Sequence, residues 1–307
     1  MEARERSVQI VVTPGSGEGR AMARAGRLRR LLRQRGWTCR QLAFSNLADL
    51  THWARTTEPD FSHLVAVGGD ATASAAATLA VRRAIPFVPV PNGFGNVFAS
   101  VFGHSDRAES VVALLATGQV RMVDVGVAGE EVFLSHRSYG FLEQVQATAE
   151  QGRQQPRGRL LRHLWYYGVA RDVLLRMPLP RIAVELDGRG IADDAVLVTV
   201  ANVETYRGFL SLTPTASPID GMFDVFIVPR RGKLRLAAKL LQVMAHVPGR
   251  WRGVSTYRGS NVAITAEGRR DDLRVWRKAL PLLVPSGSME ALRQRTVDQD
   301  GPVIRAS

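Results

Sequence analysis

Short apolar runs alternate with segments of helical periodicity along the first 127 residues. Runs rich in valine and isoleucine predict buried strands, and apolar residues that recur every three or four positions predict amphipathic helices. Strands and helices that alternate in this way form a parallel sheet covered by helices on both faces. The predicted strands are 8–13, 38–44, 65–67, 86–90 and 121–127; the predicted helices are 21–34, a segment capped by Asn46 or Asp49 that ends near 55, 73–81 and 107–117.

After residue 127 the pattern changes to short strands separated by turn signals, which is typical of an antiparallel sandwich. We therefore predict a doubly wound α/β domain at 1–126, completed by 283–307, and an antiparallel β-sandwich domain at 127–282. The segment 151–158 reads as a mobile loop. The predicted strands of the second domain are 131–137, 181–186, 195–201, 223–228, 261–266, 273–276 and 280–284, with helices at 160–176 and 233–247.

The charge is strongly positive, with a net value of +13. No Asp or Glu occurs between Val225 and Ala266, so this surface favours polyanions. Scattered arginines on solvated faces are an equally good explanation. No nucleic-acid-binding signature accompanies the charge, so we expect an anionic membrane surface and no nucleic acid. The predicted helix at 233–247 has an apolar stripe flanked by basic residues, which indicates either docking at a membrane interface or packing on the sandwich. The stripe consists of Leu234, Ala237, Leu241 and Met244, and the flanking residues are Lys233, Arg235 and Lys239.

Cellular location follows from two weaker features. Cys39 is the only cysteine, which excludes an internal disulfide and fits a reducing compartment. Residues 1–6 carry charges and lack the apolar core of a secretory signal. We expect a cytoplasmic protein, peripheral to the inner face of the membrane, and consider a homodimer.

Candidate chemistry gathers in glycine-rich loops that follow predicted strands. The first is Gly68-Gly69-Asp70-Ala71-Thr72, where the strand 65–67 meets the helix 73–81. Backbone N–H groups and the helix dipole at such a junction bind phosphate, and a carboxylate there reaches a metal ion. A Gly-Gly-Asp turn is also a common way to leave a strand, but a second loop, 91–96, follows the next strand. Because the carboxyl ends of parallel strands meet at one sheet edge, we expect both loops to line one crevice.

In these loops the sequence resembles the diacylglycerol kinase catalytic-domain family, which includes bacterial lipid kinases and the ceramide and sphingosine kinases. The family's opening Asn-Pro-x-Ser-Gly, its Gly-Gly-Asp-Gly-Thr and its Pro-x-Gly-Thr-Gly-Asn are matched in order at 13–17, 68–72 and 91–96. Later matches follow in the same order: Val123-Asp124-Val125-Gly126, the run from Asn202 to Gly208, and the segment 214–225 with Asp220-Gly221. Together these motifs span most of the chain.

The resemblance implies ATP and Mg²⁺ as cofactors and a lipid as substrate. It places ATP on Gly68, Gly69, Asp70, Ala71, Thr72, Gly93, Phe94, Gly95 and Asn96. It places catalytic magnesium at Asp70 and Asp124, directly or through water. It also implies a structural magnesium in the second domain, held by Asp220 and the backbone carbonyls of Ser217 and Met222.

Three departures from the family pattern bear on function. Ala71 replaces a glycine that lets backbone approach phosphate, and Phe94 replaces a threonine hydroxyl. Arg269 stands where the family has a glutamate as general base, and a guanidinium cannot accept a proton at neutral pH. Nearby candidates for the base are Glu267, Asp271 and Asp272. We choose Asp271, because residues two apart on a strand share a face, although a solvent-exposed turn acid is an equally simple interpretation.

Two functions of different classes fit this pattern. The first is an ATP- and Mg²⁺-dependent kinase that phosphorylates a lipid hydroxyl such as that of diacylglycerol. The second is a catalytically impaired relative that binds nucleotide or lipid as a sensor or partner-binding protein, which Ala71 and Arg269 favour. A kinase acting on a soluble acceptor such as NAD shares the Gly-Gly-Asp loop, but the Asp220 segment and the sandwich argue against it.

Overall fold

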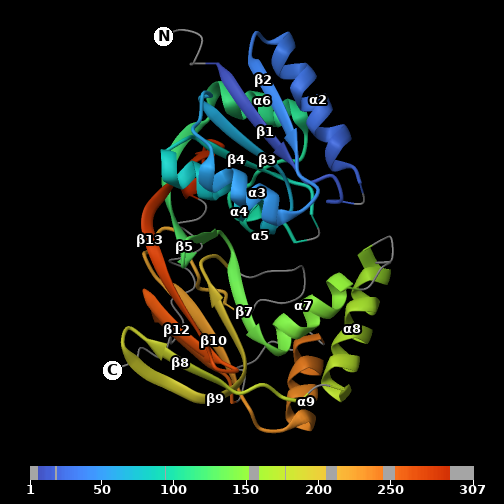
Figure 1. Ribbon diagram of the computed structural model, residues 1–307, viewed down its shortest axis with the longest axis vertical. Coiled ribbons are helices and arrows are strands. Elements are labelled where there is room, and N and C mark those ends of the chain that lie inside the picture. Colours follow the sequence, from blue (N-terminus) through green and yellow to red (C-terminus); the bar gives the residue numbers. More distant parts are fainter. Residues whose placement is uncertain are drawn as a thin grey trace.

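The computed structural model describes residues 6–17, 19–93, 95–151, 159–176, 178–204, 213–244 and 253–290. The chain forms an upper α/β part and a lower β-rich part (Figure 1). Strand pairing joins the two parts into one continuous mixed sheet, with 13 strands among the described residues.

The upper part has a parallel sheet at its centre. Its strands are β1 (Ser7–Val12), β2 (Thr38–Ala43), β3 (His63–Gly68) and β4 (Phe87–Pro91), and neighbours pair in parallel from β2 through β1 and β3 to β4. Side chains alternate between two cores, since Val65 packs with one and Leu64 with the other. The doubly wound arrangement is therefore confirmed.

Helices cover both faces of this sheet. Helices α2 (Ala21–Gln34) and α6 (Ala108–Thr117) share one core, while α3 (Leu47–Thr56) and α4 (Asp70–Arg83) share the other. Asn46 caps α3 as predicted, because its side chain accepts a hydrogen bond from the Asp49 N–H at 2.9 Å. The short helix α5 (Val97–Val101) was not predicted.

Two long strands connect the parts. Strand β5 (Gln119–Ala128) pairs antiparallel with β13 (Arg269–Val284), and the register shifts between Trp276 and Leu280. The sequence predicted two strands here, at 273–276 and 280–284. The structure shows one strand with an irregularity, where Lys278 has φ of 48°. Beyond it, Leu282 pairs with Phe87 of β4, so the end of β13 belongs to the upper sheet.

The lower part folds back on itself into two packed layers. One layer contains β8 (Ile182–Leu186) and β12 (Asn261–Ala266) beside the first half of β13. The other contains β7 (His136–Gly140), the end of β9 (Arg189–Ala201), β10 (Phe223–Pro229) and β11 (Ser255–Gly259). Side chains of both layers, such as Ile264 and Val225, share one core. The predicted antiparallel sandwich is confirmed.

Several predicted elements of the lower part need correction. The predicted strand 131–137 is two strands, β6 (Glu131–Phe133) and β7, because the chain leaves one layer for the other. Helix α7 (Phe141–Gln151) and strand β11 were missed, whereas α8 (Arg159–Arg176) and α9 (Lys233–Met244) lie near their predicted positions. Residues 152–158 of the predicted mobile loop lie outside the described residues.

The apolar stripe predicted on α9 does not form a single buried or exposed face. Leu234 is 88% exposed, Ala237 is partly buried, and Leu236, which was not assigned to the stripe, is 3% exposed and packs with α7 and α8 residues. The side chains of Leu241, Met244 and Lys239 lie outside the described residues. Within the described ranges, no helix has the length and hydropathy needed to span a bilayer.

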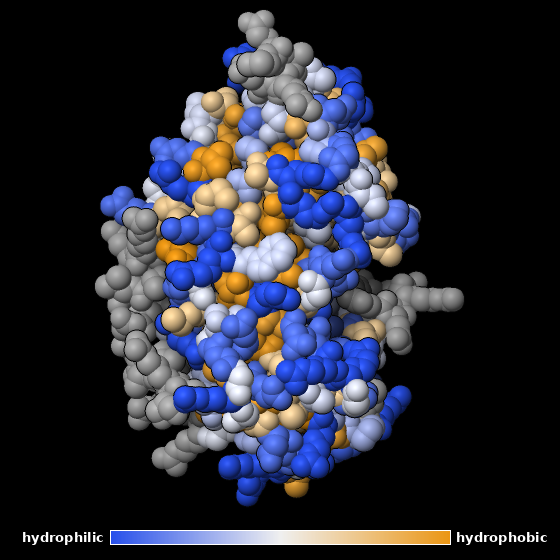
Figure 2. All heavy atoms as spheres, turned by 60° about the vertical axis from the view of Figure 1, so that its left-hand side comes forward, coloured by the Kyte–Doolittle hydropathy of each residue, from blue (hydrophilic) through white to orange (hydrophobic). Residues whose placement is uncertain are grey.

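Exposed apolar side chains also occur on the strands that join the two parts. Val120 and Met122 of β5 are each 44% exposed, and Trp276 of β13 is 42% exposed. Figure 2 turns this side of the molecule forward and shows hydrophobic residues in small areas separated by hydrophilic ones. Hydrophobic areas of this size do not test the homodimer considered above, which stays a prediction.

Candidate functional site

The loop between β3 and α4 brings a carboxylate to the carboxyl edge of the parallel sheet. Gly69 is the N-cap of α4 and Asp70 its first residue. Gly68 needs the absence of a side chain, because a Cβ there would lie 2.4 Å from the Thr72 side chain. The Thr72 hydroxyl is hydrogen-bonded to the Thr13 hydroxyl at 2.9 Å, which ties the loop to the end of β1. Ala71 is exposed in the first turn of the helix.

The loop after β4 lies directly against the first loop. A Cβ on Gly93 would lie 2.5 Å from the Cα of Gly69, so the two backbones are in contact. Asn96, in the left-handed region with φ of 48°, accepts a hydrogen bond from the Gly93 N–H and donates one to its carbonyl, both at 2.7 Å. Gly95 precedes Asn96 in this loop, whereas Phe94 lies outside the described residues.

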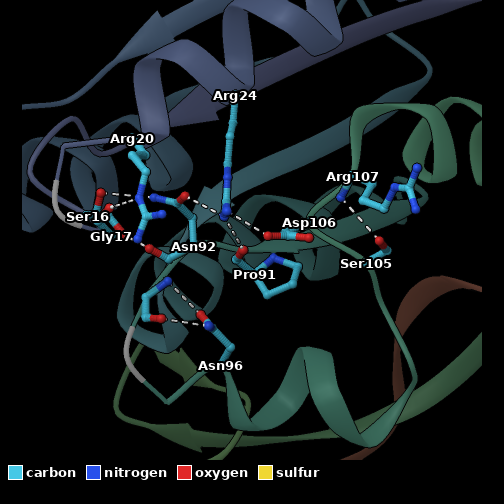
Figure 3. Close-up of polar contacts among 11 residues, drawn as sticks. Ser16, Gly17, Arg20, Arg24, Pro91, Asn92, Asn96, Ser105, Asp106 and Arg107 are labelled. Carbon is cyan, nitrogen blue, oxygen red and sulfur yellow. Dashed lines mark hydrogen bonds and ion pairs between the residues drawn. The ribbon is translucent and has the colours of Figure 1, made fainter. Parts of the chain in front are cut away.

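A third loop, 13–17, and the start of α2 complete this edge (Figure 3). Asn92 donates to the Ser16 carbonyl at 2.9 Å, and Ser16 Oγ donates to the Asn92 carbonyl at 3.0 Å. Arg24 donates to Asn92 Oδ1 at 2.8 Å and pairs with Asp106 at 2.6 Å. These contacts border a cavity of about 370 Å³, which Gly17, Arg20, Gly93, Asn96 and His104 also line.

A larger cavity, of about 590 Å³, lies between the upper and lower parts. Asp70, Ala71 and Ser74 of α4 line one side, and residues of β6, β7, α7, α8 and β13 line the other. Asp70 Oδ1 accepts a hydrogen bond from the Phe98 N–H at 3.2 Å, which fixes the carboxylate at the cavity wall. For Asp70 Oδ2 the described residues provide no donor within hydrogen-bond distance. The cavity therefore presents a carboxylate oxygen that is available to a ligand.

Asp271 lines the same cavity as Asp70. It is half-buried, and its Oδ2 accepts a hydrogen bond from the Tyr139 hydroxyl at 2.5 Å and one from Arg137 at 3.4 Å. Burial raises the pKa of Tyr139 above its usual value, and the neighbouring Asp271 carboxylate raises it further, so the phenol stays protonated and donates. Arg269 lines the cavity as well, in agreement with the expected alternation along the strand.

The other candidates for a base lie elsewhere. Asp272 is exposed and accepts a hydrogen bond from Arg270 at 3.0 Å, and Arg270 also pairs with Glu185 outside the cavity. Glu267 is an exposed residue of the turn between β12 and β13, with φ of 52°. Of the three acids, only Asp271 is among the cavity-lining residues.

Asp124 has a different environment from the one expected of a metal ligand. It is 2% exposed and lines neither of the two cavities. Its Oδ2 accepts from the Gly221 N–H and its Oδ1 from the Lys278 N–H, both at 2.7 Å. Asn202 donates to the Asp124 carbonyl at 3.1 Å. Asp124 therefore joins β5 to the 217–222 turn and to the irregularity of β13.

Asp220 lies in that turn, next to an arginine that the sequence did not single out. Asp220 Oδ1 accepts from the Met222 N–H at 3.0 Å, and Oδ2 accepts from Arg258. Ser217 is 1% exposed, and its hydroxyl has no partner among the described residues. Within the described ranges, no group of three or more His, Cys, Asp or Glu side chains is arranged to hold a metal ion.

Three functional candidates were missed by sequence reasoning. Arg137 and Tyr139 reach Asp271 from β7, and Arg258 reaches Asp220 from β11. Arg137 and Tyr139 are two residues apart, so they were detectable as one strand face, but the partner across the fold was not. Residues 205–212, which include most of the Asn202–Gly208 motif, lie outside the described residues.

Comparisons with known proteins agree with this geometry. The family model of the diacylglycerol kinase catalytic domain matches residues 7–128, and that of the YegS C-terminal NAD kinase beta sandwich-like domain matches residues 140–276. The chain is 30% identical over 243 residues to a Pseudomonas putida protein named "Probable lipid kinase YegS-like", covering 74% of this chain and 79% of that protein. It is 25% identical to a diacylglycerol kinase of Mycobacterium tuberculosis, with 85% of each chain covered.

A solved structure has the same fold. The crystal structure of a diacylglycerol kinase from Bacillus anthracis matches with a TM-score of 0.64 and 17% sequence identity. The match covers 92% of this chain and 98% of that one.

Proposed function

Because the chain belongs to the diacylglycerol kinase catalytic-domain family, we propose that it is a lipid kinase that transfers the γ-phosphoryl group of ATP to a lipid hydroxyl, such as that of diacylglycerol. One observation carries the proposal: Asp70 and Asp271 line a single cavity. Asp70 belongs to the glycine-rich edge, which is the sheet edge formed by the loops 13–17, 68–72 and 91–96, and Asp271 belongs to the sandwich. A donor and an acceptor bound at these two walls meet between the two parts of the molecule.

The glycine-rich edge supplies the nucleotide site. Gly17, Gly68 and Gly93 stand where a Cβ would overlap neighbouring protein atoms, so the loops pack closely together at the sheet edge. Helix α4 begins at this edge, and the N–H groups of a helix N-terminus bind phosphate. Arg20 and Arg24 line the adjoining cavity and contribute positive charge. Asp70, with one carboxylate oxygen available, fits a Mg²⁺ ion, which needs few protein ligands and neutralises charge on the transferring phosphoryl group when bound.

Asp271 serves as the base in this proposal. Its Oδ2 is held by Tyr139 and Arg137, which leaves Oδ1 to accept the proton of the lipid hydroxyl. The lipid oxygen forms the new bond to the γ-phosphorus, the bond to the β,γ-bridging oxygen breaks, and ADP leaves. Arg269 and Arg137 add positive charge beside the transferred group. Positioning and charge neutralisation supply most of the rate in such transfers, so the family's glutamate is not essential.

A membrane-facing surface completes the proposal, because the acceptor is a lipid. Leu234 is 88% exposed, with Lys233 and Arg235 beside it, and the segment 225–266 lacks acids. We propose that the start of α9 contacts anionic bilayers. Leu234→Ser is expected to reduce sedimentation with anionic liposomes, and equal pelleting with neutral and anionic vesicles would argue against the electrostatic contribution.

The proposed activity is tested with radiolabelled ATP, magnesium and a panel of diacylglycerol, ceramide, sphingosine and NAD. We expect lipid phosphorylation that Asp271→Asn lowers by about 100-fold or more, while its neighbour Asp272→Asn leaves it unchanged. Asp70→Asn is expected to weaken magnesium-dependent ATP binding in calorimetry without unfolding the protein.

Each alternative has its own outcome in this assay. Phosphorylation that none of the acid substitutions affects would remove Asp271 from the mechanism. ATP binding with no transfer to any lipid would overturn the kinase proposal in favour of a nucleotide-binding relative, which the arginine at 269 favours.

A further inference from the structure

Three carboxylates converge where the 217–222 turn meets β5 and β10. Asp224 is fully buried, Asp124 is 2% exposed, and the Asp220 side chain is 22% exposed. The pKa of Asp220 is raised to about 6: burial raises it most, Arg258 and the Met222 N–H lower it, and the negative charges of Asp224 and Asp124 raise it by smaller amounts. Two buried acids and a mostly buried one in the same place need a positive charge to remain ionised.

Arg258 supplies that charge from the neighbouring strand. It lies directly opposite Asp224 in the antiparallel pairing of β10 and β11, so the two side chains share a face. Its Nε donates to Asp224 Oδ1 at 2.9 Å and its Nη2 donates to Asp220 Oδ2. The guanidinium therefore bridges two carboxylates with two nitrogens, and it is itself only 22% exposed.

The remaining carboxylate oxygens are also occupied. The Thr215 hydroxyl donates to Asp224 Oδ2, and the Met222 N–H donates to Asp220 Oδ1. Both oxygens of Asp124 accept from backbone N–H groups of Gly221 and Lys278. Every carboxylate oxygen of the three acids thus accepts a hydrogen bond, and Met222 presents an N–H to Asp220.

This donor set does not fit the structural magnesium that the family resemblance implies at Asp220. Magnesium requires near-octahedral coordination by oxygen atoms, whereas every carboxylate oxygen of these three acids already accepts a hydrogen bond. The Arg258 guanidinium contacts one oxygen of Asp220, and the Met222 N–H contacts the other. We propose that Arg258 is the built-in cation of this turn and takes the place of the metal ion, so that the second domain folds without a divalent cation.

The bridge also has a mechanical role. By fixing Asp220, Arg258 holds the turn whose Gly221 N–H binds Asp124 on β5, and the other oxygen of Asp124 holds the backbone of Lys278 on β13. Loss of Arg258 is therefore expected to weaken the contacts of the 217–222 turn with β5 and β13.

Thermal unfolding in the absence of nucleotide tests the proposal. The parent protein for the test is Asp70→Asn, which removes the carboxylate of the proposed catalytic metal site. We expect its unfolding midpoint to be the same in chelator and in millimolar Mg²⁺ or Ca²⁺. Adding Arg258→Gln is expected to lower the midpoint by roughly 10 °C, because a mostly buried ion pair loses one partner.

Arg230→Gln is the matched control, because Arg230 forms an exposed pair with Asp194 at 2.7 Å. Its midpoint is expected to fall by less than about 2 °C. If Arg258→Gln does not fold, Arg258→Lys, which keeps the charge, is expected to fold and to remain indifferent to divalent cations. Stabilisation of the Asp70→Asn protein by several degrees in Mg²⁺ would overturn the proposal, as would equal effects of the Arg258 and Arg230 substitutions. Neither outcome depends on kinase activity.

Discussion

Substitution of Gly93 by alanine tests whether contact between the two glycine-rich loops creates the nucleotide site. The new Cβ would lie 2.5 Å from the Gly69 Cα, 3.1 Å from Asn96 Oδ1 and 3.3 Å from the Gly69 N. Carbon atoms in contact are about 3.5–4.0 Å apart, so the loops must separate by about 1 Å. The nearest atoms belong to backbone, which cannot turn aside as a flexible side chain does.

The size of the effect follows from this displacement. A shift of about 1 Å takes a backbone N–H out of hydrogen-bond range of a phosphate oxygen; a hydrogen bond to a charged group contributes about 1.5–3 kcal/mol, so the ATP affinity is expected to fall by roughly 10- to 100-fold. Overpacking in a well-packed region lowers the free energy of unfolding by about 1–3 kcal/mol. The affinity is therefore expected to change strongly while most of the protein stays folded.

Calorimetric titration with magnesium and ATP, beside urea unfolding, measures both quantities. The control is Gly26→Ala in α2, where a Cβ meets no other atom within 4 Å. Alanine in this helix is expected to raise the free energy of unfolding by about 0.5–1 kcal/mol without changing ATP affinity. A Gly93→Ala protein that binds ATP as tightly as the wild type would show that the contact of the loops does not position the nucleotide.

Two further predictions concern stability. Burial lowers the pKa of His104 to about 4, so the unfolded chain binds more protons than the folded one between pH 6.5 and 4. We therefore expect the free energy of unfolding to fall by up to about 3 kcal/mol as the pH drops through this range. Urea unfolding at several pH values should show this loss in the wild type and less of it in His104→Gln; parallel profiles would contradict it. Asn202 is fully buried and donates to the carbonyls of Asp124 and Leu134. Asn202→Leu is therefore expected to lower the free energy of unfolding by about 2 kcal/mol. An unchanged urea midpoint would show that these two hydrogen bonds do not stabilise the fold.

The upper part could be predicted from the sequence because its signals are local. Buried strands of a parallel sheet are continuous apolar runs, as in β3, and the glycines that follow them end each run clearly. Asn46 was predicted as a helix cap because its partner, the Asp49 N–H, is also local in the sequence. What escaped prediction depends on partners far along the chain: β13 was divided in two, because the irregular stretch around Lys278 looks like a turn until Asp124 is known to hold its backbone.

The candidate site shows the same division. Asp70 and Asp271 were predicted from a motif and from strand alternation, and both line one cavity. The environment of Asp124 was not predictable, since its two hydrogen bonds come from residues 97 and 154 positions away. Arg258 was counted among many basic residues of an acid-free segment, and only the pairing of β10 with β11 gives it a specific role.

The path of β13 has a consequence for how the protein is synthesised. The strand that completes the upper sheet beside β4 lies at residues 280–284, whereas the other strands of that sheet lie within the first 128 residues. A ribosome therefore makes the whole sandwich before the upper sheet can close, and the emerging chain carries an uncovered β4 edge in the meantime. Long-range pairing of this kind is slow, and unpaired edges expose a chain to aggregation. A fragment ending near residue 128 is expected to need β13, supplied as a separate peptide, before it folds.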